Sequence, residues 1–306
     1  MQSFESTQIP ECPHNVAASP HTPSPASTHQ SPDGTCKYLF ELPDGLSIET
    51  VYIPEKNRHT LCVSTQAGCR MGCRFCATGQ MRLQAQLTTE QILGQIDAVP
   101  EAAKLTHLVF MGMGEPFDNP TALFPALIRL MDPKEYGFAP RRISVSTAGV
   151  LPGIVRYLRT FSSPLSISLH SPFAEERAAL MPIENKWPIA DIMRTIRKIP
   201  LSSHRRIFCE YLVFKDMNHT PAHAKALAEL LQGIPVRMNL MRPHPIPGHN
   251  FTAPDDAAML AFRDALNEQG LIATIRRSRG IEIDAACGML ATKPNRKQLL
   301  DSEAGK

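Results

Sequence analysis

Three cysteines lie close together in a short loop, at Cys69, Cys73 and Cys76, with Gly68 and Gly72 between and beside them. A cubane iron–sulfur cluster is normally held by four thiolates, one on each iron. Three thiolates in one tight loop therefore leave one iron open to a small molecule. The C-x3-C-x2-C spacing thus predicts a [4Fe-4S] cluster that presents one iron to a substrate or cofactor.

A zinc site is the alternative for the same three cysteines, with Cys62 as the fourth ligand. Zinc also prefers four soft ligands in a tetrahedral array. The spacing of the cysteines does not separate the two metals by itself. The motifs elsewhere in the chain are what favour the iron–sulfur cluster.

Further short motifs accompany the segment Thr60–Thr78 in a fixed order. They are Met111–Pro116 (MGMGEP), Ser146–Gly149 (STAG), Ser168–His170 (SLH) and Ile283–Gly288 (IDAACG). From about Lys37 to about Ala291 the chain resembles the RlmN/Cfr family of radical S-adenosylmethionine (SAM) RNA methyltransferases. The most specific element of the resemblance is the pair Cys62 and Cys287, which most radical SAM enzymes lack.

The resemblance implies which residues bind the cofactors. Cys69, Cys73 and Cys76 would hold the cluster, and the amino and carboxylate groups of SAM would take the open iron. The residues expected to contact SAM are Gly114, Glu115, Ser146, Ser168, Leu169, His170 and His244. Gly114 and Glu115 would bind its amino end. His244 stands where the family commonly has asparagine, and histidine can supply a comparable hydrogen bond.

Each of these motifs also has an ordinary structural explanation when taken singly. A Gly-Glu-Pro sequence is often only a turn, and His170 at a strand end is often a satisfied structural histidine. Two positions depart from the family pattern, because Arg82 and Gln86 stand where glycine and asparagine are expected. The agreement of the motifs in order and spacing is what supports SAM binding.

The resemblance also implies a division of labour between the two lone cysteines. Cys287 takes a methyl group from one SAM by displacement. A second SAM, cleaved reductively at the cluster, yields a 5′-deoxyadenosyl radical that removes a hydrogen from that methyl group, and the carbon then adds to an adenine. Glu49 accepts the proton of the base, and Cys62 releases the product by forming a transient disulfide with Cys287. The structural alternatives are an exposed hairpin residue for Glu49 and a core thiol for Cys287.

Composition agrees with this interpretation without requiring it. The chain has 306 residues, of which 43% are hydrophobic, and this suits one large domain or two small ones. No apolar run approaches the roughly 18 residues that a membrane span needs, and Met1–Glu11 does not resemble a signal peptide. We therefore expect a cytoplasmic protein, in which clustered cysteines indicate metal or redox chemistry.

Four segments are expected along the chain. Residues 1–35 are predicted to be a disordered Pro/Ser-rich tail, because so few apolar residues cannot offset chain entropy. Residues 36–57 show an alternating sequence pattern on each side of a turn at Asp44–Gly45, and this pattern predicts a β-hairpin. Residues 58–291 form the radical SAM core, and 292–306 form a polar C-terminal tail. Close relatives carry an amino-terminal accessory domain that aids RNA binding, where this chain offers only the tail and the hairpin.

Within the core, strands and helices alternate as in a parallel α/β protein. Strands are predicted at 61–65, 108–112, 143–146, 165–169, 207–213, 236–240 and 272–275, and the clearest helices near 88, 121–131, 222–231 and 255–268. Thr88 and Gln91 form a potential capping box. The family's partial (βα)6 barrel fits this order. The motifs fall at or just past strand carboxyl ends, where barrel active sites lie.

Charge adds a weak indication of the partner. A net charge of +3 with a pI near 8.4 mildly favours a polyanion. The basic clusters that are candidates for phosphate contacts, or for ordinary solvated surface, are Arg141–Arg142, His204–Arg206, Arg276, Arg277, Arg279, Lys293, Arg296 and Lys297.

The resemblance to the RlmN/Cfr family predicts a monomeric radical SAM methyltransferase that acts on an adenine, at C2, in 23S ribosomal RNA and in transfer RNA. Its electron donor would be a flavodoxin or a ferredoxin. The alternatives are methylation at adenine C8 by the same residues and a zinc-dependent RNA-binding protein without turnover. An enzyme that modifies a base in RNA needs that base to be unstacked from its neighbours. Bases in loops and single strands meet this requirement most easily.

Overall fold

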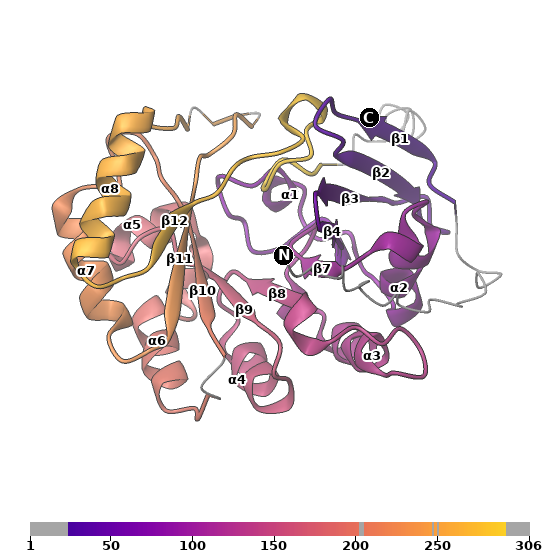
Figure 1. Ribbon diagram of the computed structural model, residues 1–306, viewed down its shortest axis with the longest axis horizontal. Coiled ribbons are helices and arrows are strands. Elements are labelled where there is room, and N and C mark those ends of the chain that lie inside the picture. The colour runs from indigo at the N-terminus through magenta and orange to yellow at the C-terminus, as the bar shows by residue number, and fades with distance from the viewer. Residues whose placement is uncertain (1–23, 202–204, 247, 250, 292–306) are drawn as a thin grey trace, which may run out of the picture.

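The computed structural model describes residues 24–201, 205–246, 248–249 and 251–291. His204, the basic residues from Lys293 onward and the predicted C-terminal tail at 292–306 lie outside these residues. Figure 1 shows a curved sheet with helices packed along its outer side.

The described strands form one ten-stranded sheet in the order β1-β2-β3-β4-β7-β8-β9-β10-β11-β12. An antiparallel part comprises β1 (Ser27–Gln30), β2 (Cys36–Glu41), β3 (Ser47–Glu55) and β4 (Arg58–Cys62). The parallel part runs from β4 through β7 (His107–Phe110), β8 (Ile143–Thr147), β9 (Leu165–Ser168), β10 (Ile207–Leu212), β11 (Val236–Met241) and β12 (Ala273–Ile275). The short strands β5 (Gln66–Ala67) and β6 (Ala85–Gln86) pair separately.

Helices follow six of the parallel strands. They are α1 (Ala77–Gln80), α2 (Thr89–Ala98), α3 (Pro120–Met131), α4 (Leu151–Thr160), α5 (Ala174–Leu180), α6 (Ile189–Arg197), α7 (Pro221–Leu231) and α8 (Asp256–Glu268). In the described chain, β12 ends the parallel sheet without a following α-helix. The partial (βα)6 barrel predicted from the sequence is therefore confirmed, with β12 as an additional last strand.

Local sequence accounts for several of these boundaries. The predicted capping box is present at α2, where Thr88 Oγ1 accepts from the Gln91 amide at 3.2 Å and Gln91 Oε1 accepts from the Thr88 amide at 2.8 Å. Asp255 caps α8 through the amide of Ala258. The strand predicted at 61–65 begins three residues earlier, at Arg58.

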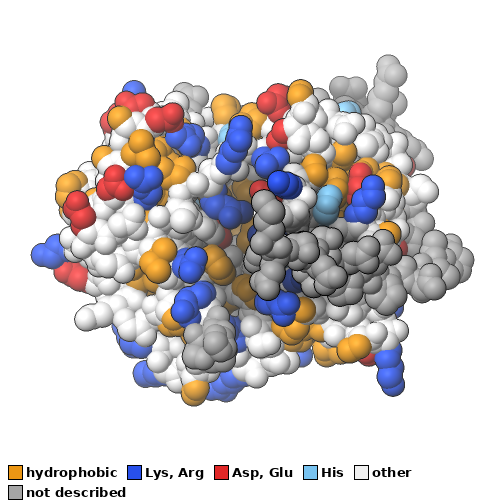
Figure 2. All heavy atoms as spheres, in the orientation of Figure 1, with side chains coloured by type: hydrophobic (Ala, Val, Ile, Leu, Met, Phe, Trp, Pro, Cys, Tyr) orange, Lys and Arg blue, Asp and Glu red, His pale blue; other side chains and the backbone are white. Residues whose placement is uncertain are grey.

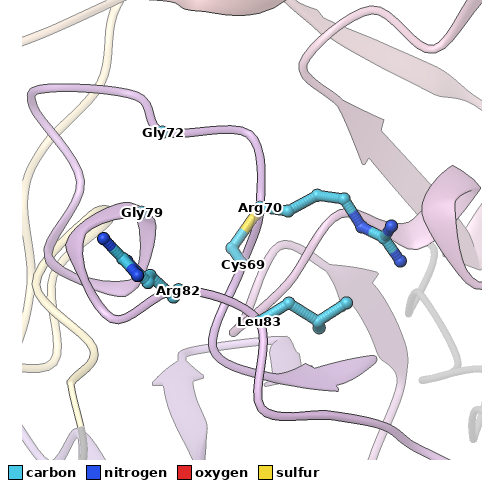
Figure 3. Close-up of a pocket in the computed structure, with 6 residues that line it drawn as sticks. All are labelled: Cys69, Arg70, Gly72, Gly79, Arg82 and Leu83. Carbon is cyan, nitrogen blue, oxygen red and sulfur yellow. The ribbon is translucent and has the colours of Figure 1, made fainter.

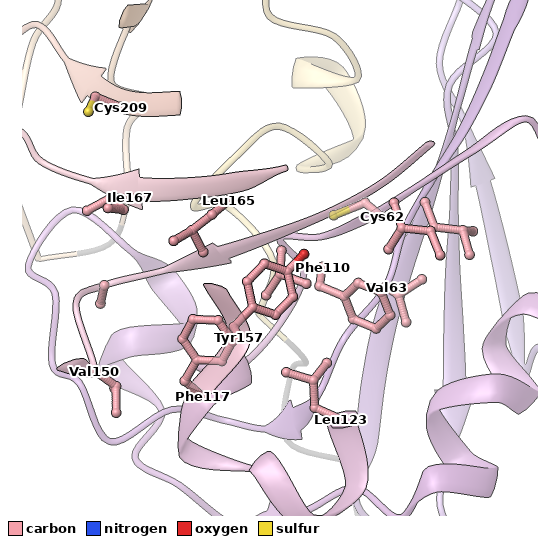
Figure 4. Packing of buried hydrophobic residues seen from close by; sticks show 14 of the residues in the cluster. Cys62, Val63, Phe110, Phe117, Leu123, Val150, Tyr157, Leu165, Ile167 and Cys209 are labelled. Atoms are coloured by element: carbon pink, nitrogen blue, oxygen red, sulfur yellow. The ribbon is translucent and has the colours of Figure 1, made fainter. Parts of the chain in front are cut away.

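The core lies between the sheet and its helices (Figure 4). Phe110 of β7 and Leu165 of β9 are fully buried there. Phe117 and Tyr157 pack against them from outside the sheet, with ring centroids 5.4 Å apart. Cys209 on β10 is also fully buried, as its strand pattern predicts. This packing holds the carboxyl ends of the strands at fixed positions.

The prediction of a disordered tail over residues 1–35 is wrong for its last part. Residues 27–30 form β1, which pairs antiparallel with β2. A turn follows, in which Asp33 Oδ1 accepts from the Thr35 amide at 2.9 Å and the Gly34 amide donates to Ser31 O at 2.9 Å. Average composition concealed this strand, because a short edge strand needs backbone pairing more than apolar side chains. The hairpin predicted at 36–57 is confirmed as β2 and β3.

None of the helices in the described part of the chain is long and apolar enough to cross a membrane.

Candidate active site

The cluster loop, defined as residues 69–76, connects β5 to α1 at the carboxyl edge of the parallel strands. Two contacts anchor it to the barrel. The Arg74 amide donates to Leu180 O of α5 at 2.9 Å, and Phe75 packs edge-on against His170 with ring centroids 4.5 Å apart. An open pocket of about 470 Å³ lies beside the loop, lined by Cys69, Arg70, Gly72, Gly79, Arg82 and Leu83. Figure 3 shows the side chains of Cys69 and Arg82 in this wall.

The three cysteines of this loop act on one another electrostatically. Burial raises the pKa of Cys69 to about 12 and raises the pKa of Cys73 and Cys76 as well. The charges of Cys76 and Cys69 raise the pKa of Cys73 further. Buried cysteine thiols of this kind lose their protons only when a cationic group lies beside them. The donor set therefore fits an iron–sulfur cluster.

A mononuclear zinc site fits the described residues less well. No three His, Cys, Asp or Glu side chains among them converge as ligands of a single metal ion. Cys62, the proposed fourth ligand, interacts instead with Cys287, whose charge raises its pKa beyond the effect of burial.

Glu115, predicted to bind the amino end of SAM, is buried beneath the cluster loop. Its Oε1 accepts from Thr147 Oγ1 at 2.7 Å and from the Phe117 amide at 3.1 Å, and its Oε2 accepts from the Ala148 amide at 2.7 Å. These donors are neutral, and burial raises the pKa of Glu115 to about 7. An ammonium group would provide the missing positive charge. The residue thus fits the role that the sequence predicts.

Gly114 lies beside Glu115 with φ at +97°, which favours glycine. A Cβ atom there would lie 2.5 Å from the Gln66 side chain. The Gln66 side chain in turn accepts from the Glu115 amide through Oε1, at 2.7 Å. The close approach fixes the backbone that carries the glutamate.

Ser146, Ser168, Leu169 and His170 lie at the carboxyl ends of β8 and β9, as predicted. Leu169 and His170 are buried, and the two serines are partly exposed. His170 has φ at +58°, an uncommon conformation for a residue with a Cβ atom. Its Nδ1 accepts from the Leu212 amide at 2.9 Å, so the ring is neutral with its proton on Nε2. Burial lowers its pKa to about 3.

Arg177 of α5 holds these two strand ends together, a role that the sequence analysis did not predict. Its guanidinium is fully buried and donates to the carbonyl oxygens of Ala148, Ser168 and Leu169 at 2.8, 2.9 and 3.1 Å. It also pairs with Glu184, at 2.5 Å. An arginine in the pattern Ala-Glu-Glu-Arg is normally exposed, and its only signal is the apolar Leu180-Met181 that follows.

His244 is half-buried after β11, and its Nε2 lies 3.0 Å from Ser278 Oγ. Burial lowers its pKa. The described contacts do not connect it with Glu115 or His170, so its SAM contact stays a prediction.

The Cys287 loop, defined as residues 280–291, packs between the cluster loop and the antiparallel strands. The Ala77 amide donates to Gly288 O at 2.7 Å, and Thr78 Oγ1 donates to Leu290 O at 2.5 Å. Cys287 is exposed at the surface of this loop. The surrounding chain still desolvates the thiol and raises its pKa to about 11, while the charge of Arg276 acts in the opposite direction. A core-thiol explanation of Cys287 is therefore wrong.

The strand register places the predicted catalytic residues on one face of the sheet. Val51 of β3 lies directly opposite Cys62 of β4, and directly opposed residues share a face. Glu49, two residues before Val51, points to the same face because side chains alternate along a strand. The Glu49 carboxylate is buried and accepts from the Ala291 amide at 2.9 Å through Oε2. It is not the exposed hairpin residue of the structural alternative.

Arg205 does not make the phosphate contact predicted for its cluster, whereas the contacts predicted for Arg141 and Arg142 stay predictions. Arg205 is buried and caps the end of α4 by donating to the carbonyl oxygens of Leu158 and Phe161. Arg141 and Arg142 precede β8 and therefore lie at the edge of the sheet opposite the site. Arg276 and Arg277, which follow β12, are exposed.

Comparison with known proteins identifies the family of this chain. The model of the radical SAM superfamily matches residues 63–227. The probable dual-specificity RNA methyltransferase RlmN of Parabacteroides distasonis is 49% identical over 271 residues, covering 89% of this chain and 79% of its own. The dual-specificity RNA methyltransferase RlmN of Syntrophobacter fumaroxidans is 42% identical, with coverage of 86% and 78%.

A solved structure supports the same assignment. The crystal structure of a radical SAM methyltransferase from Sphaerobacter thermophilus superposes with a TM-score of 0.85 at 38% identity, covering 89% of this chain and 82% of that one. The fold and the site define a radical SAM enzyme. This chain belongs to the RlmN-type RNA methyltransferases of that superfamily, as the sequence motifs predict.

Proposed function

We propose that this enzyme methylates C2 of an adenine in 23S ribosomal RNA and in transfer RNA, with Cys287 as the carrier of the methyl group. The observation that carries the proposal is the shared placement of Glu49, Cys62 and the Cys287 loop beside the cluster loop. Adenine C2 is electrophilic, so direct polar attack by this carbon on a SAM methyl group is not available. A cysteine that carries the carbon solves this problem.

A [4Fe-4S] cluster on Cys69, Cys73 and Cys76, with SAM at its open iron, would supply the one-electron chemistry that activates the carried methyl group. Glu115 would hold the ammonium group of SAM. The thiolate of Cys287 first displaces the methyl group from the sulfonium of another SAM and leaves S-adenosylhomocysteine. The exposed position of Cys287 gives it access to both SAM and RNA.

Product release needs Cys62 and Glu49. Once the carbon joins Cys287 to the base, the adduct holds one unpaired electron. The base becomes aromatic again when this electron passes to a one-electron acceptor, which the cluster would supply, and the Glu49 carboxylate accepts the proton of the base carbon. The Cys62 thiolate then attacks the Cys287 sulfur. An S–S bond forms and the bond between the Cys287 sulfur and the carbon breaks. The released electron pair takes up the proton that the Cys62 thiol gave up, and this completes the methyl group. The charge of Cys287 acts on Cys62 and raises its pKa, which supports the pairing of these two cysteines.

An RNA surface is proposed around the Cys287 loop. Figure 2 shows Lys and Arg side chains gathered around the middle of one face, with most Asp and Glu side chains nearer its rim. Arg276 is exposed, and its charge acts on Cys287. An arginine in this position can contact a backbone phosphate of a base that is turned out towards the cysteine. The electron donor, the monomeric state and the cytoplasmic location stay predictions.

Nucleoside mass spectrometry tests the proposed reaction. Ribosomal and transfer RNA from cells with the gene, without it, and with Cys287→Ala are digested and compared. We expect 2-methyladenosine only with the intact gene. Finding 8-methyladenosine instead would contradict the position of methylation, and an unchanged nucleoside profile would contradict the substrate.

The cluster assignment has its own test. Replacing Cys69, Cys73 and Cys76 together by alanine should remove iron and acid-labile sulfide from anaerobically purified protein, and 5′-deoxyadenosine formation with them. Cys209→Ala, in a buried cysteine outside the site, is the control and should keep both. A triple variant that still cleaves SAM under reducing conditions would contradict the assignment of these cysteines to a radical SAM cluster.

A further inference from the structure

Lys37 of β2 contacts both Glu49, the proposed proton acceptor, and the Cys287 loop. Its Nζ lies 3.0 Å from Glu49 Oε1, and the same atom donates to the carbonyl oxygen of Asp284 at 3.4 Å. Asp284 lies three residues before Cys287. One ammonium group therefore joins the proposed proton acceptor to the loop that carries the methyl group.

The strand register explains how a residue so far along the sequence reaches the loop. Lys37 lies directly opposite Val51 on β3, and Val51 lies directly opposite Cys62 on β4. The three side chains therefore form a row on the face that the Cys287 loop covers. Glu49 is the diagonal neighbour of Lys37 on that face.

The ion pair between Lys37 and Glu49 is buried, so removing one partner costs more free energy than it would at the surface. The side chains of Lys37 and Glu49 are 11% and 7% exposed. A charge withdrawn from water to this extent loses much of its hydration, so removing its partner is costly. The carboxylate also accepts from the Ala291 amide through its other oxygen. The Cys287 loop is thus attached to Glu49 on one side and to Lys37 on the other.

The backbone conformation of Asp284 is a second reason to assign a role to the Lys37 contact. Asp284 adopts φ at +53°, in the left-handed region that a residue with a Cβ atom seldom occupies. Its amide donates to Ile281 O at 3.1 Å. Such a conformation persists only where neighbouring contacts hold it. The described partner of the Asp284 carbonyl oxygen is the Lys37 ammonium group.

We propose that Lys37 is a positioning residue for product release, which holds the Glu49 carboxylate and the Cys287 loop together while the proton leaves the base. This inference rests on the proposed function. Lys37 touches neither the SAM residues nor the cluster loop through any described contact. Its removal should therefore spare the transfer of a methyl group to Cys287 and slow the later steps.

The test compares Lys37→Met, Lys37→Arg and Lys56→Met in the holoenzyme. Methionine keeps the length of the side chain and removes its charge, and arginine keeps the charge. Lys56 is an exposed lysine in the turn after β3 and serves as the matched control. Three quantities are measured: methyl on Cys287 by peptide mass spectrometry, methylated adenine, and covalent protein–RNA adduct.

For Lys37→Met we expect Cys287 methylation within about twofold of wild type, product formation lowered about tenfold or more, and accumulated adduct. Lys37→Arg should restore product to within about threefold, and Lys56→Met should resemble wild type. Normal turnover by Lys37→Met would overturn the inference. Loss of Cys287 methylation together with product would also overturn it, because that pattern indicates a general structural role.

A second measurement separates this inference from the proposed function. Hydrogen exchange of residues 281–291 is recorded without RNA, and the amides of this loop should exchange at least about threefold faster in Lys37→Met than in Lys37→Arg or Lys56→Met. If wild type methylates no RNA, the proposed function fails and the exchange result alone decides the positioning role. If exchange is unchanged in Lys37→Met, the positioning role fails, whatever the RNA substrate is.

Discussion

The amide of Ala77, next to the proposed cluster ligand Cys76, donates a hydrogen bond to the carbonyl oxygen of Gly288, next to Cys287, at 2.7 Å. The backbone beside the proposed cluster ligand is thus joined directly to the backbone beside the proposed methyl carrier. Gly288 has φ at +82°, and a Cβ atom there would lie 3.1 Å from Phe75 O. Glycine at this position therefore allows the two loops to approach closely.

The amino-terminal strand also supports the Cys287 loop. Ser31 Oγ donates to Glu282 at 2.8 Å, and the Gly280 amide donates to Asp33 at 3.3 Å. Removing residues 1–35 should therefore free the Cys287 loop and lower product formation. A tail that was disordered throughout, as composition predicts for residues 1–35, would be removed without this effect.

A protein that begins at residue 24 keeps β1 and these contacts, and it is the control for the longer deletion. Adenine methylation and hydrogen exchange of residues 281–291 are measured for both. We expect the shorter deletion to resemble the full chain and the longer one to exchange faster. Equal behaviour of the two would show that β1 does not support the loop.

Arg177→Met should destabilise the protein by about 3–5 kcal/mol, because it leaves Glu184 buried without its partner. It also leaves three carbonyl oxygens at the ends of β8 and β9 without their donor. Denaturant unfolding measures the change in the free energy of unfolding. Arg194→Met removes an exposed pair with Asp191 and should cost less than about 1 kcal/mol. Comparable losses in the two variants would contradict the role assigned to Arg177.

Arg82 is held in the left-handed region, with φ at +46°. The backbone cannot easily relax, because a Cβ atom on Gly68 would lie only 1.9 Å from Arg82 O. Arg82→Gly should therefore raise the free energy of unfolding by about 0.5–1 kcal/mol, since glycine accepts this conformation without strain. Arg82→Ala keeps the Cβ atom and should show no such gain. A stabilising alanine variant would mean that the side chain, rather than the backbone, is unfavourable.

Features encoded by neighbouring residues could be predicted from the sequence. The cluster loop depends on the spacing of Cys69, Cys73 and Cys76 alone, and the parallel strands depend on short apolar runs. The capping box at Thr88 and Gln91 is equally local. These predictions agree with the fold because burial of apolar runs and satisfaction of helix ends act over a few residues.

Features that depend on distant residues could not be predicted. Lys37 and Asp284 lie 247 positions apart, and no sequence pattern around either residue predicts their contact. Arg177 looks like an exposed helical residue until α5 docks against the strand ends. β1 was missed because its partner, β2, supplies the hydrogen bonds that its composition does not suggest. Tertiary pairing decides all three cases.

The measurement that tests this account most directly is mass spectrometry of Cys62→Ala protein purified from cells. Cys287 should still carry the methyl group and join the base, but without Cys62 the bond to Cys287 should not be released. We expect a nuclease-sensitive protein–RNA adduct in which one carbon links Cys287 to an adenine, and no such adduct in the Cys62→Ala, Cys287→Ala double variant. Normal turnover of Cys62→Ala without an adduct would contradict the two-cysteine mechanism.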